Sequence, residues 1–324
     1  MTAPARPVET IPPRRSFLAW WARLQSQDVW LILLLMVLGS AIIAPDFLSA
    51  ENLSNLLDNC AIIGLISLGQ FLVILSGGFD LSVAGVLALA GMIAAASTNE
   101  FGLVALPGAL LVGAVLGAIN GLAVTKFDIP PFIATLGMAG VARGIGYAVS
   151  EQTLVANAAF FDQLRETSVG PVPLTAIVWL GVAFLLWILL RRFRIGQYIA
   201  AVGGNNEAAR LAGVNVARVK LLVYTLSGLL AGLAGLLYVV RSGSGVPQLG
   251  LGWELDSIAI VVIGGSNLFG GSGQLPKALA ATIIYLMIGN VMNLASVDPY
   301  FQSIMAAVIV VAVVVLRLAQ NRDE

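Results

Sequence analysis

The chain carries few side chains whose types and spacing could support catalysis. It has no histidine, the commonest general base and metal ligand, and its single cysteine, Cys60, lies in an apolar run typical of a buried, inert thiol. The glycine-rich run 264–271 lacks the Lys-Ser/Thr pair with which a P-loop binds nucleotide phosphates. We therefore predict no catalytic residue, no metal site and no nucleotide cofactor in this chain, so any ATP would be bound by another subunit.

Polar residues that interrupt apolar runs are the remaining candidates for chemistry. The run Gly-Gly-Phe-Asp-Leu-Ser at 77–82 separates two apolar stretches. Because a charge deep in lipid is costly, Asp80 either caps the helix expected from Val83 or faces a polar pathway, as broken helices do in transporters. Six residues are predicted to line such a pathway, although most could instead form hydrogen bonds between helices: Gln70, Asp80, Ser82, Asn120, Thr135 and Asn267.

The composition predicts a membrane protein. Of the 324 residues, 59% are hydrophobic and only 10% are charged, whereas a soluble domain carries about 25% charged residues. The formal net charge is zero, so no basic field favours nucleic acid as a partner. Lipid is the expected surrounding for most of this chain.

Apolar segments long enough to cross a bilayer predict an all-α, polytopic transmembrane helical bundle. A spanning helix needs about 20 mostly apolar residues. Ten segments fit, of which the first and the eighth fit least well: Val29–Ala44, Asn59–Ser76, Val83–Thr98, Gly102–Val124, Pro131–Val149, Pro171–Leu190, Val219–Val240, Ser257–Gly270, Lys277–Ala295 and Phe301–Leu316. The transmembrane domain is thus expected at 29–318, between an N-terminal tail at 1–28 and a C-terminal tail at 319–324.

The distribution of Lys and Arg predicts the orientation. With ten spans and a cytosolic N-terminus, 14 of the 17 Lys and Arg residues fall on the cytosolic side, as the positive-inside rule requires. The outer side holds Arg143, Arg165 and Arg241. Both termini are therefore expected in the cytosol. The largest outer loop, at 150–170, would hold a short helix at 158–165, and the largest inner loop covers 191–218.

Two sequence echoes suggest an internal repeat. The run at 77–81 is similar to 264–268, at an offset of 187 residues, and the run at 128–132 is similar to 298–301, at an offset of 170. The expected topology places the second pair on opposite sides of the membrane, which fits an inverted repeat. Chance similarity in a glycine-rich chain is the alternative.

The inner loop 191–218 predicts a short helix that protrudes into the cytosol. Asn205 or Asn206 suits the N-cap and Gly213 suits the C-terminal stop, so the helix is expected at Glu207–Ala212. It could be an ordinary connector, but an exposed amphipathic helix also suits docking into a groove of a partner. Eight residues form this candidate docking site: Gly203, Gly204, Asn205, Glu207, Ala208, Ala209, Arg210 and Gly213.

Three motifs together resemble the permease family of bacterial ABC importers for ribose, xylose, arabinose and related solutes, within the branched-chain amino-acid permease-like superfamily. The run at 77–82 resembles that family's Gly-Gly-x-Asp-Leu-Ser, and the run at 131–137 resembles its Pro-Phe-Ile-x-Thr-Leu-Gly. A third resemblance covers 254–259 and 262–265. At 266–271 the chain departs from the family's Thr-Ser-Leu-x-Gly-Gly, which bears on substrate choice.

The resemblance implies a multi-pass permease subunit of the bacterial inner membrane that transports a monosaccharide or a related solute. It implies three protein partners: a cytosolic ATPase subunit that binds ATP, a periplasmic sugar-binding protein and a second copy of the permease. It also implies that the loop 191–218 couples the permease to the ATPase. The sequence does not name the sugar.

Two other classes of membrane protein remain as alternatives. An ion-gradient-driven secondary transporter of a small polar solute would carry paired ionisable groups within its helices. Here only Asp80 and Arg143 are candidates, and the expected topology places them near opposite faces of the membrane. An integral-membrane enzyme would need a nucleophile with a base or a metal site, and no such arrangement is recognisable.

Overall fold

A computed structural model describes residues 28–101, 106–156, 159–298 and, except for 303 and 306, 300–308. Residues 1–27 of the expected N-terminal tail, the tail 319–324 and half of the last expected span lie outside these ranges. The described helices are α2 (Asp28–Ile43), the 3-10 helix η1 (Pro45–Leu48), α3 (Ala50–Leu75), α4 (Val83–Phe101), α5 (Leu106–Lys126), α6 (Pro131–Val149), α7 (Ala159–Glu166), α8 (Leu174–Arg192), α9 (Arg194–Gly204), α10 (Asn206–Leu211), α11 (Val216–Ser242), α12 (Trp253–Ile263) and α13 (Leu275–Leu294).

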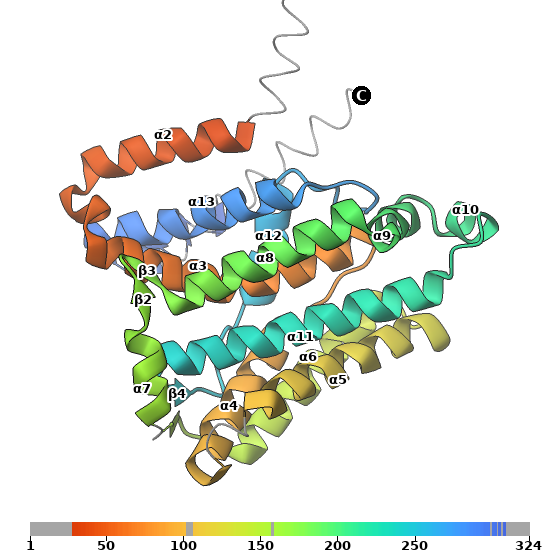
Figure 1. Ribbon diagram of the computed structural model, residues 1–324, viewed down its shortest axis with the longest axis horizontal. Helices are drawn as coiled ribbons and strands as arrows, with labels where there is room; N and C mark the ends of the chain where they lie inside the picture. Colours follow the sequence, from red (N-terminus) through yellow and green to blue (C-terminus); the bar gives the residue numbers. More distant parts are fainter. Residues whose placement is uncertain are drawn as a thin grey trace, which may run out of the picture.

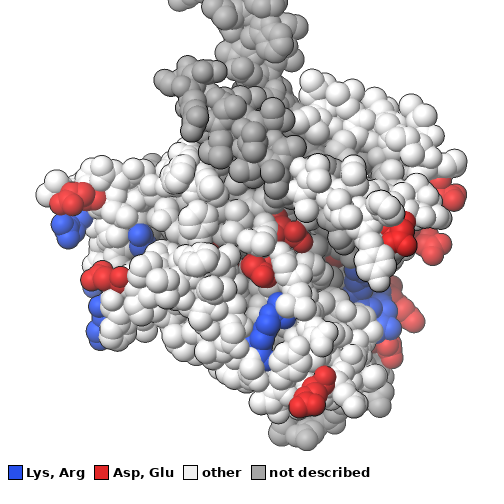
Figure 2. All heavy atoms as spheres, turned by 180° about the vertical axis from the view of Figure 1, so that it is seen from behind, with Lys and Arg blue, Asp and Glu red and all other residues white. Residues whose placement is uncertain are grey.

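Six of these helices are long and apolar enough to cross a membrane, namely α3, α5, α6, α8, α11 and α13, and α2 and α4 contain shorter apolar helices. The prediction of an all-α polytopic membrane protein is therefore confirmed. The surface that Figure 2 shows is largely free of charged side chains, and many of those present lie toward its two opposite edges.

The start of α3 differs from the predicted Asn59. The helix begins nine residues earlier, where the side chain of Ser49 accepts a hydrogen bond from the Asn52 N–H and Glu51 lies in the first turn. These are favourable N-terminal features of a helix. The polar residues of this first part fall outside any apolar window, so hydropathy alone could not predict them.

The predicted span Ser257–Gly270 is wrong. The helix there, α12, has 11 residues and is about 16 Å long, whereas the hydrocarbon core of a bilayer is about 30 Å thick. It stops because Gly265 adopts a left-handed conformation with φ of 79°, and the Ser266 N–H donates to the Val261 carbonyl, which together terminate an α-helix. The chain then turns until α13 begins.

Glycines allow the central helices to approach closely. α11 packs against α3, α4 and α5, while α3 also packs against α8, α12 and α13 (Figure 1). A Cβ atom at Gly113 or Gly117 of α5 would overlap the backbone of α11 near Gly228. Small residues at such positions let membrane helices gain dispersion contacts between backbones.

The two ends of the bundle carry different structures (Figure 1). At one end lie α7 and two small antiparallel sheets, β1 (Leu154–Val155) with β4 (Ser244–Gly245), and β2 (Ser168–Val169) with β3 (Val172–Pro173). α7 confirms the short helix predicted in the loop 150–170. At the other end lie α9 and α10, so the loop 191–218 contains two helices rather than the one predicted.

Candidate functional site

The helix α10 is capped at both ends by the residues predicted to do so. The Asn205 Oδ1 accepts a hydrogen bond of 2.9 Å from the Ala208 N–H, which identifies Asn205 rather than Asn206 as the N-cap. At the other end Gly213 has a φ of 84°, and its N–H donates to the Arg210 carbonyl. This left-handed position favours glycine. α10 is thus a locally defined, single-turn projection.

The surface of α10 differs in part from the predicted docking face. Ala208 and Ala212 are exposed, as expected, but Ala209 is 5% exposed and packs into the core. Sequence reasoning missed Leu211, which is 81% exposed and follows Ala208 at a spacing of three, so both lie on one side of the helix. We call Ala208, Leu211 and Ala212 the apolar ridge of α10.

Glu207 and Arg210 form an ion pair with an N–O distance of 3.2 Å. Their side chains are 72% and 71% exposed, and a pair this exposed contributes about 0.2–1 kcal/mol at most. The pair is therefore a weak local contact that leaves both side chains available at the rim of the apolar ridge.

Three segments of the chain meet at a junction of glycines beside α9. Gly203, in the last turn of α9, packs so closely that a Cβ atom there would overlap the carbonyl oxygen of Leu75, at the end of α3, and approach the Gly271 nitrogen within 2.6 Å. The Gly271 N–H also donates to the Leu75 carbonyl at 3.1 Å. The neighbouring Gly204 is different, because a Cβ there would meet only the Gly271 Cα at 3.9 Å.

Two further glycines complete this junction. A Cβ at Gly270 would lie 2.8 Å from the Gly203 oxygen and 2.8 Å from the Gly77 Cα, and both Gly77 and Gly270 have positive φ angles, of 76° and 96°. We call Gly77, Gly203, Gly270 and Gly271 the glycine junction. It joins α9 to the ends of both interrupted segments, at 77–82 and 264–271, through backbone atoms that cannot adjust as a flexible side chain can.

The break between α3 and α4 is held by Asp80, which is fully buried. One carboxylate oxygen accepts hydrogen bonds from the Ser82 N–H at 3.0 Å and from the Ser82 hydroxyl at 2.6 Å. The other accepts from the Ser227 hydroxyl of α11 at 2.8 Å. Three donors therefore offset part of the cost of burying this group, which supports the capping role considered from the sequence.

Two other predicted residues join Asp80 in one network. The Asn120 side chain of α5 donates to the Ser82 hydroxyl at 2.8 Å. The Thr135 hydroxyl of α6 accepts from the Leu81 N–H at 3.0 Å. The break at 77–82 thus binds α5, α6 and α11 together, and the glycine junction lies at its beginning.

Gln70 and Asn267 have no printed bond to this network. Gln70 is fully buried, and neither atom of its side-chain amide has a hydrogen-bond partner within the part of the chain that the structure describes. The Asn267 side chain accepts from the Phe269 N–H at 3.0 Å, so it shapes the turn after α12. Buried unpaired amides are rare in stable proteins, which makes Gln70 the most unusual of the six predicted pathway residues.

Arg143, the second ionisable candidate, lies on α6 and donates to the Leu249 carbonyl at 3.3 Å. Among the described residues it forms no ion pair with Asp80, whose partners are the hydroxyls of Ser82 and Ser227. The two groups therefore do not form the intramembrane charge pair that an ion-driven transporter would use.

Comparison with known proteins gives a consistent result. The profile of the family described as the branched-chain amino acid transport system / permease component matches residues 52–314. The chain is 38% identical to the ribose import permease protein RbsC of Escherichia coli K12 over 316 residues, which cover 95% of this chain and 98% of that protein. No solved structure matches the chain.

Other relatives are named for other sugars. The chain is 37% identical to the D-allose transport system permease protein AlsC of Escherichia coli K12, over 88% of this chain and 89% of that protein. It is 36% identical to the fructose import permease protein FrcC of Rhizobium meliloti, over 88% and 82%. The chain therefore belongs to the branched-chain amino acid transport system / permease component family: it is a multi-pass permease of the inner membrane and not an enzyme.

Proposed function

We propose that this chain is the membrane-spanning permease subunit of an ATP-binding-cassette importer, and that it forms the pathway for a monosaccharide or a related solute. The similarity over 95% of the chain to a ribose import permease carries this proposal. The relatives are named for ribose, D-allose, fructose and L-arabinose, so the proposal extends to the class of sugar and not to one sugar.

The partners follow from this function. A separate cytosolic ATPase binds ATP and docks on α10, while a periplasmic sugar-binding protein delivers the solute at the opposite end of the bundle, where α7 lies (Figure 1). The exposed apolar ridge supports the docking role, because an uncovered leucine on a protruding helix is typical of a contact surface. In this account the chain itself needs no metal or nucleotide, and nucleic acid is not a partner.

A second copy of the permease completes the pathway, and α6 is the surface that we assign to it. α6 is the least buried of the six long apolar helices. Its Gly137, Gly140 and Gly144 are exposed and would leave a Cβ atom without any contact within 4 Å, whereas Gly113 and Gly117 of α5 already pack against α11. Exposed glycines spaced along a membrane helix favour packing against another helix.

The predicted pathway residues keep their proposed role, with one condition. Gln70, Asp80, Ser82, Asn120 and Thr135 are all buried by protein in this conformation. They can meet a solute only after the surrounding helices move, as alternating access requires. The unpaired amide of Gln70 supports such a second state, because water or a sugar hydroxyl would satisfy it there.

An inverted repeat would account for the packing of the helices. α4 and α12 begin 170 residues apart, at Val83 and Trp253, and α5 and α13 begin 169 residues apart, close to the second sequence echo. α3 packs on α12 and α13, just as α11 packs on α4 and α5. α3 ends at the α9–α10 end of the bundle, whereas α11 begins there (Figure 1), so the two units run in opposite directions.

The first echo does not fit this repeat. The run at 77–81 follows α3 and the run at 264–268 follows α12, which occupy different places in the two proposed units. The offset of 187 therefore reflects two glycine-rich helix ends of similar sequence. With the partly described helix at 300–308, the proposed units are α3–α6 and α11 to the C-terminal span, which leaves ten spans possible only if α12 counts as a half-span.

The proposed orientation places α10 in the cytosol, α7 in the periplasm and both termini in the cytosol. We expect a single cysteine at Glu207 of a Cys60→Ala variant to react with a membrane-impermeant maleimide only in inside-out vesicles. A cysteine at Gln163, in α7, should react only in intact, outer-membrane-permeabilised cells. Labelling of position 163 only from the inside would contradict the orientation and the docking assignment with it.

A further inference from the structure

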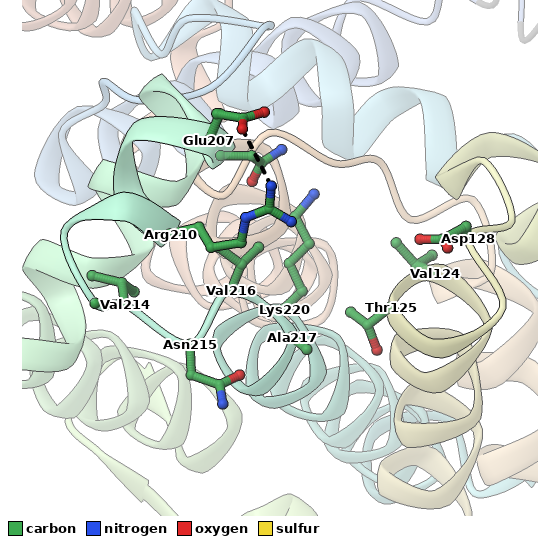
Figure 3. A pocket seen from close by; sticks show the side chains of 12 residues that line it. Val124, Thr125, Asp128, Glu207, Arg210, Val214, Asn215, Val216, Ala217 and Lys220 are labelled. Carbon is green, nitrogen blue, oxygen red and sulfur yellow. Dashed lines mark hydrogen bonds and ion pairs between the residues drawn. The ribbon is translucent and has the colours of Figure 1, made fainter.

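A polar pocket of about 660 Å³ opens beside α10. One wall is α10 itself with the loop that follows it, the second is the start of α11, and the third is the end of α5 with the turn after it. Figure 3 shows the side chains of Arg210 and Lys220 pointing into the same space, with Thr125 and Asp128 across from them. The pocket therefore lies between the proposed coupling helix and the membrane domain.

The charges in this pocket are incompletely paired. Arg210 pairs with Glu207 at 3.2 Å, but half-buried Lys220 has neither an ion pair nor a side-chain hydrogen bond within the described residues. Asp128, on the opposite wall, forms no ion pair with it. A partly buried ammonium group without a counter-charge is unfavourable, and a carboxylate brought by a partner would offset that cost through a charge-assisted hydrogen bond.

We propose that this pocket is a second part of the ATPase docking surface, and that it takes a carboxylate of the ATPase subunit, which pairs with Lys220. The proposal rests on the proposed function. The pocket shares Glu207, Arg210 and Gly213 with the coupling region and lies at the end of the bundle where α10 protrudes (Figure 1). A segment that covers the apolar ridge of α10 is therefore positioned to reach into it.

The test measures the affinity of the purified permease, in nanodiscs, for the ATPase subunit that supports its uptake, at low and at high salt. Lys220→Gln should lower the affinity at low salt about tenfold and weaken its salt dependence, and Lys220→Arg should restore most of it. Arg218→Gln is the matched control, because Arg218 lies on the same helix, is exposed and does not line the pocket. It should change the affinity less than twofold.

A second variant guards against misfolding. Asn215 lines the pocket, and its Oδ1 caps α11 by accepting from the Arg218 N–H at 3.0 Å. Aspartate is an equally good N-cap, so Asn215→Asp keeps the helix start while it adds a competing carboxylate. It should weaken ATPase binding about as much as Lys220→Gln.

The outcomes separate this proposal from the proposed function. If Lys220→Gln and Asn215→Asp bind the ATPase as tightly as the unaltered chain, the pocket assignment is overturned while the docking role of α10 stands. If removal of anionic lipid from the nanodiscs abolishes the effect of Lys220→Gln, a lipid headgroup occupies the pocket and the assignment is also overturned. If the unaltered chain binds no ATPase at all, the proposed function itself fails.

Discussion

Replacing Gly203 by alanine should reduce uptake at least about a hundredfold while the permease still inserts into the membrane and still binds its ATPase. The added Cβ would overlap the Leu75 carbonyl and crowd the Gly271 nitrogen, so α9 must shift away from both interrupted segments. α10 is untouched, since its caps are Asn205 and Gly213. The expected defect is therefore loss of transmission between the docked helix and the membrane domain.

Gly204→Ala is the matched control for this prediction. It makes the same chemical change one residue later, where the nearest atom to the new Cβ is 3.9 Å away, and both changes alter helix propensity by the same amount, about 1 kcal/mol. Uptake, ATPase co-purification and the stimulation of ATP hydrolysis by binding protein should all stay normal. Normal uptake by Gly203→Ala, or equal defects in the two variants, would contradict a role for the glycine junction in coupling.

Replacing Leu211 by aspartate should abolish association with the ATPase and uptake together. Leu211 is 81% exposed, so its loss costs the isolated permease little stability. On docking, burial of such a side chain contributes about 2 kcal/mol, or roughly 30-fold in affinity, and an unpaired carboxylate in its place adds a desolvation cost. Co-purification of the ATPase and uptake in membrane vesicles measure the two effects.

Leu211→Met is the control, because it keeps an apolar side chain of similar volume and should retain both activities. Ala209, which the sequence also suggested for such a test, is a poorer site. It is buried, so a bulky residue there would disturb α10 itself. An aspartate at 211 that leaves ATPase binding unchanged would remove the apolar ridge from the docking surface.

Hydropathy predicted much of the fold because lipid imposes a simple rule of length and polarity. The bounds of α6, Pro131–Val149, were predicted at both ends, since prolines precede the helix and a serine follows it. The rule failed where local chemistry overrides it. Polar first turns hid the start of α3, and the left-handed Gly265 ended α12 within an apolar run.

The candidate site shows a similar limit. Glycine and asparagine signals predicted α10 with both caps, because a six-residue helix depends on its own ends. α9 was missed, although Ile199 and Val202 have helical spacing on its buried face, because three glycines made the segment a weak helix former. The partner of Asp80 on α11, Ser227, is 147 residues away in sequence, and no local pattern predicts such a contact.

Reconstitution of uptake tests the central claim most directly. The permease is placed in proteoliposomes with its ATPase and with sugar-binding protein loaded with labelled ribose, allose, fructose or arabinose. At least one sugar should accumulate inside, only when ATP reaches the ATPase, and a protonophore should leave the rate unchanged. Accumulation that continues without the ATPase and collapses when the proton gradient is dissipated would contradict the account and establish an ion-driven transporter instead.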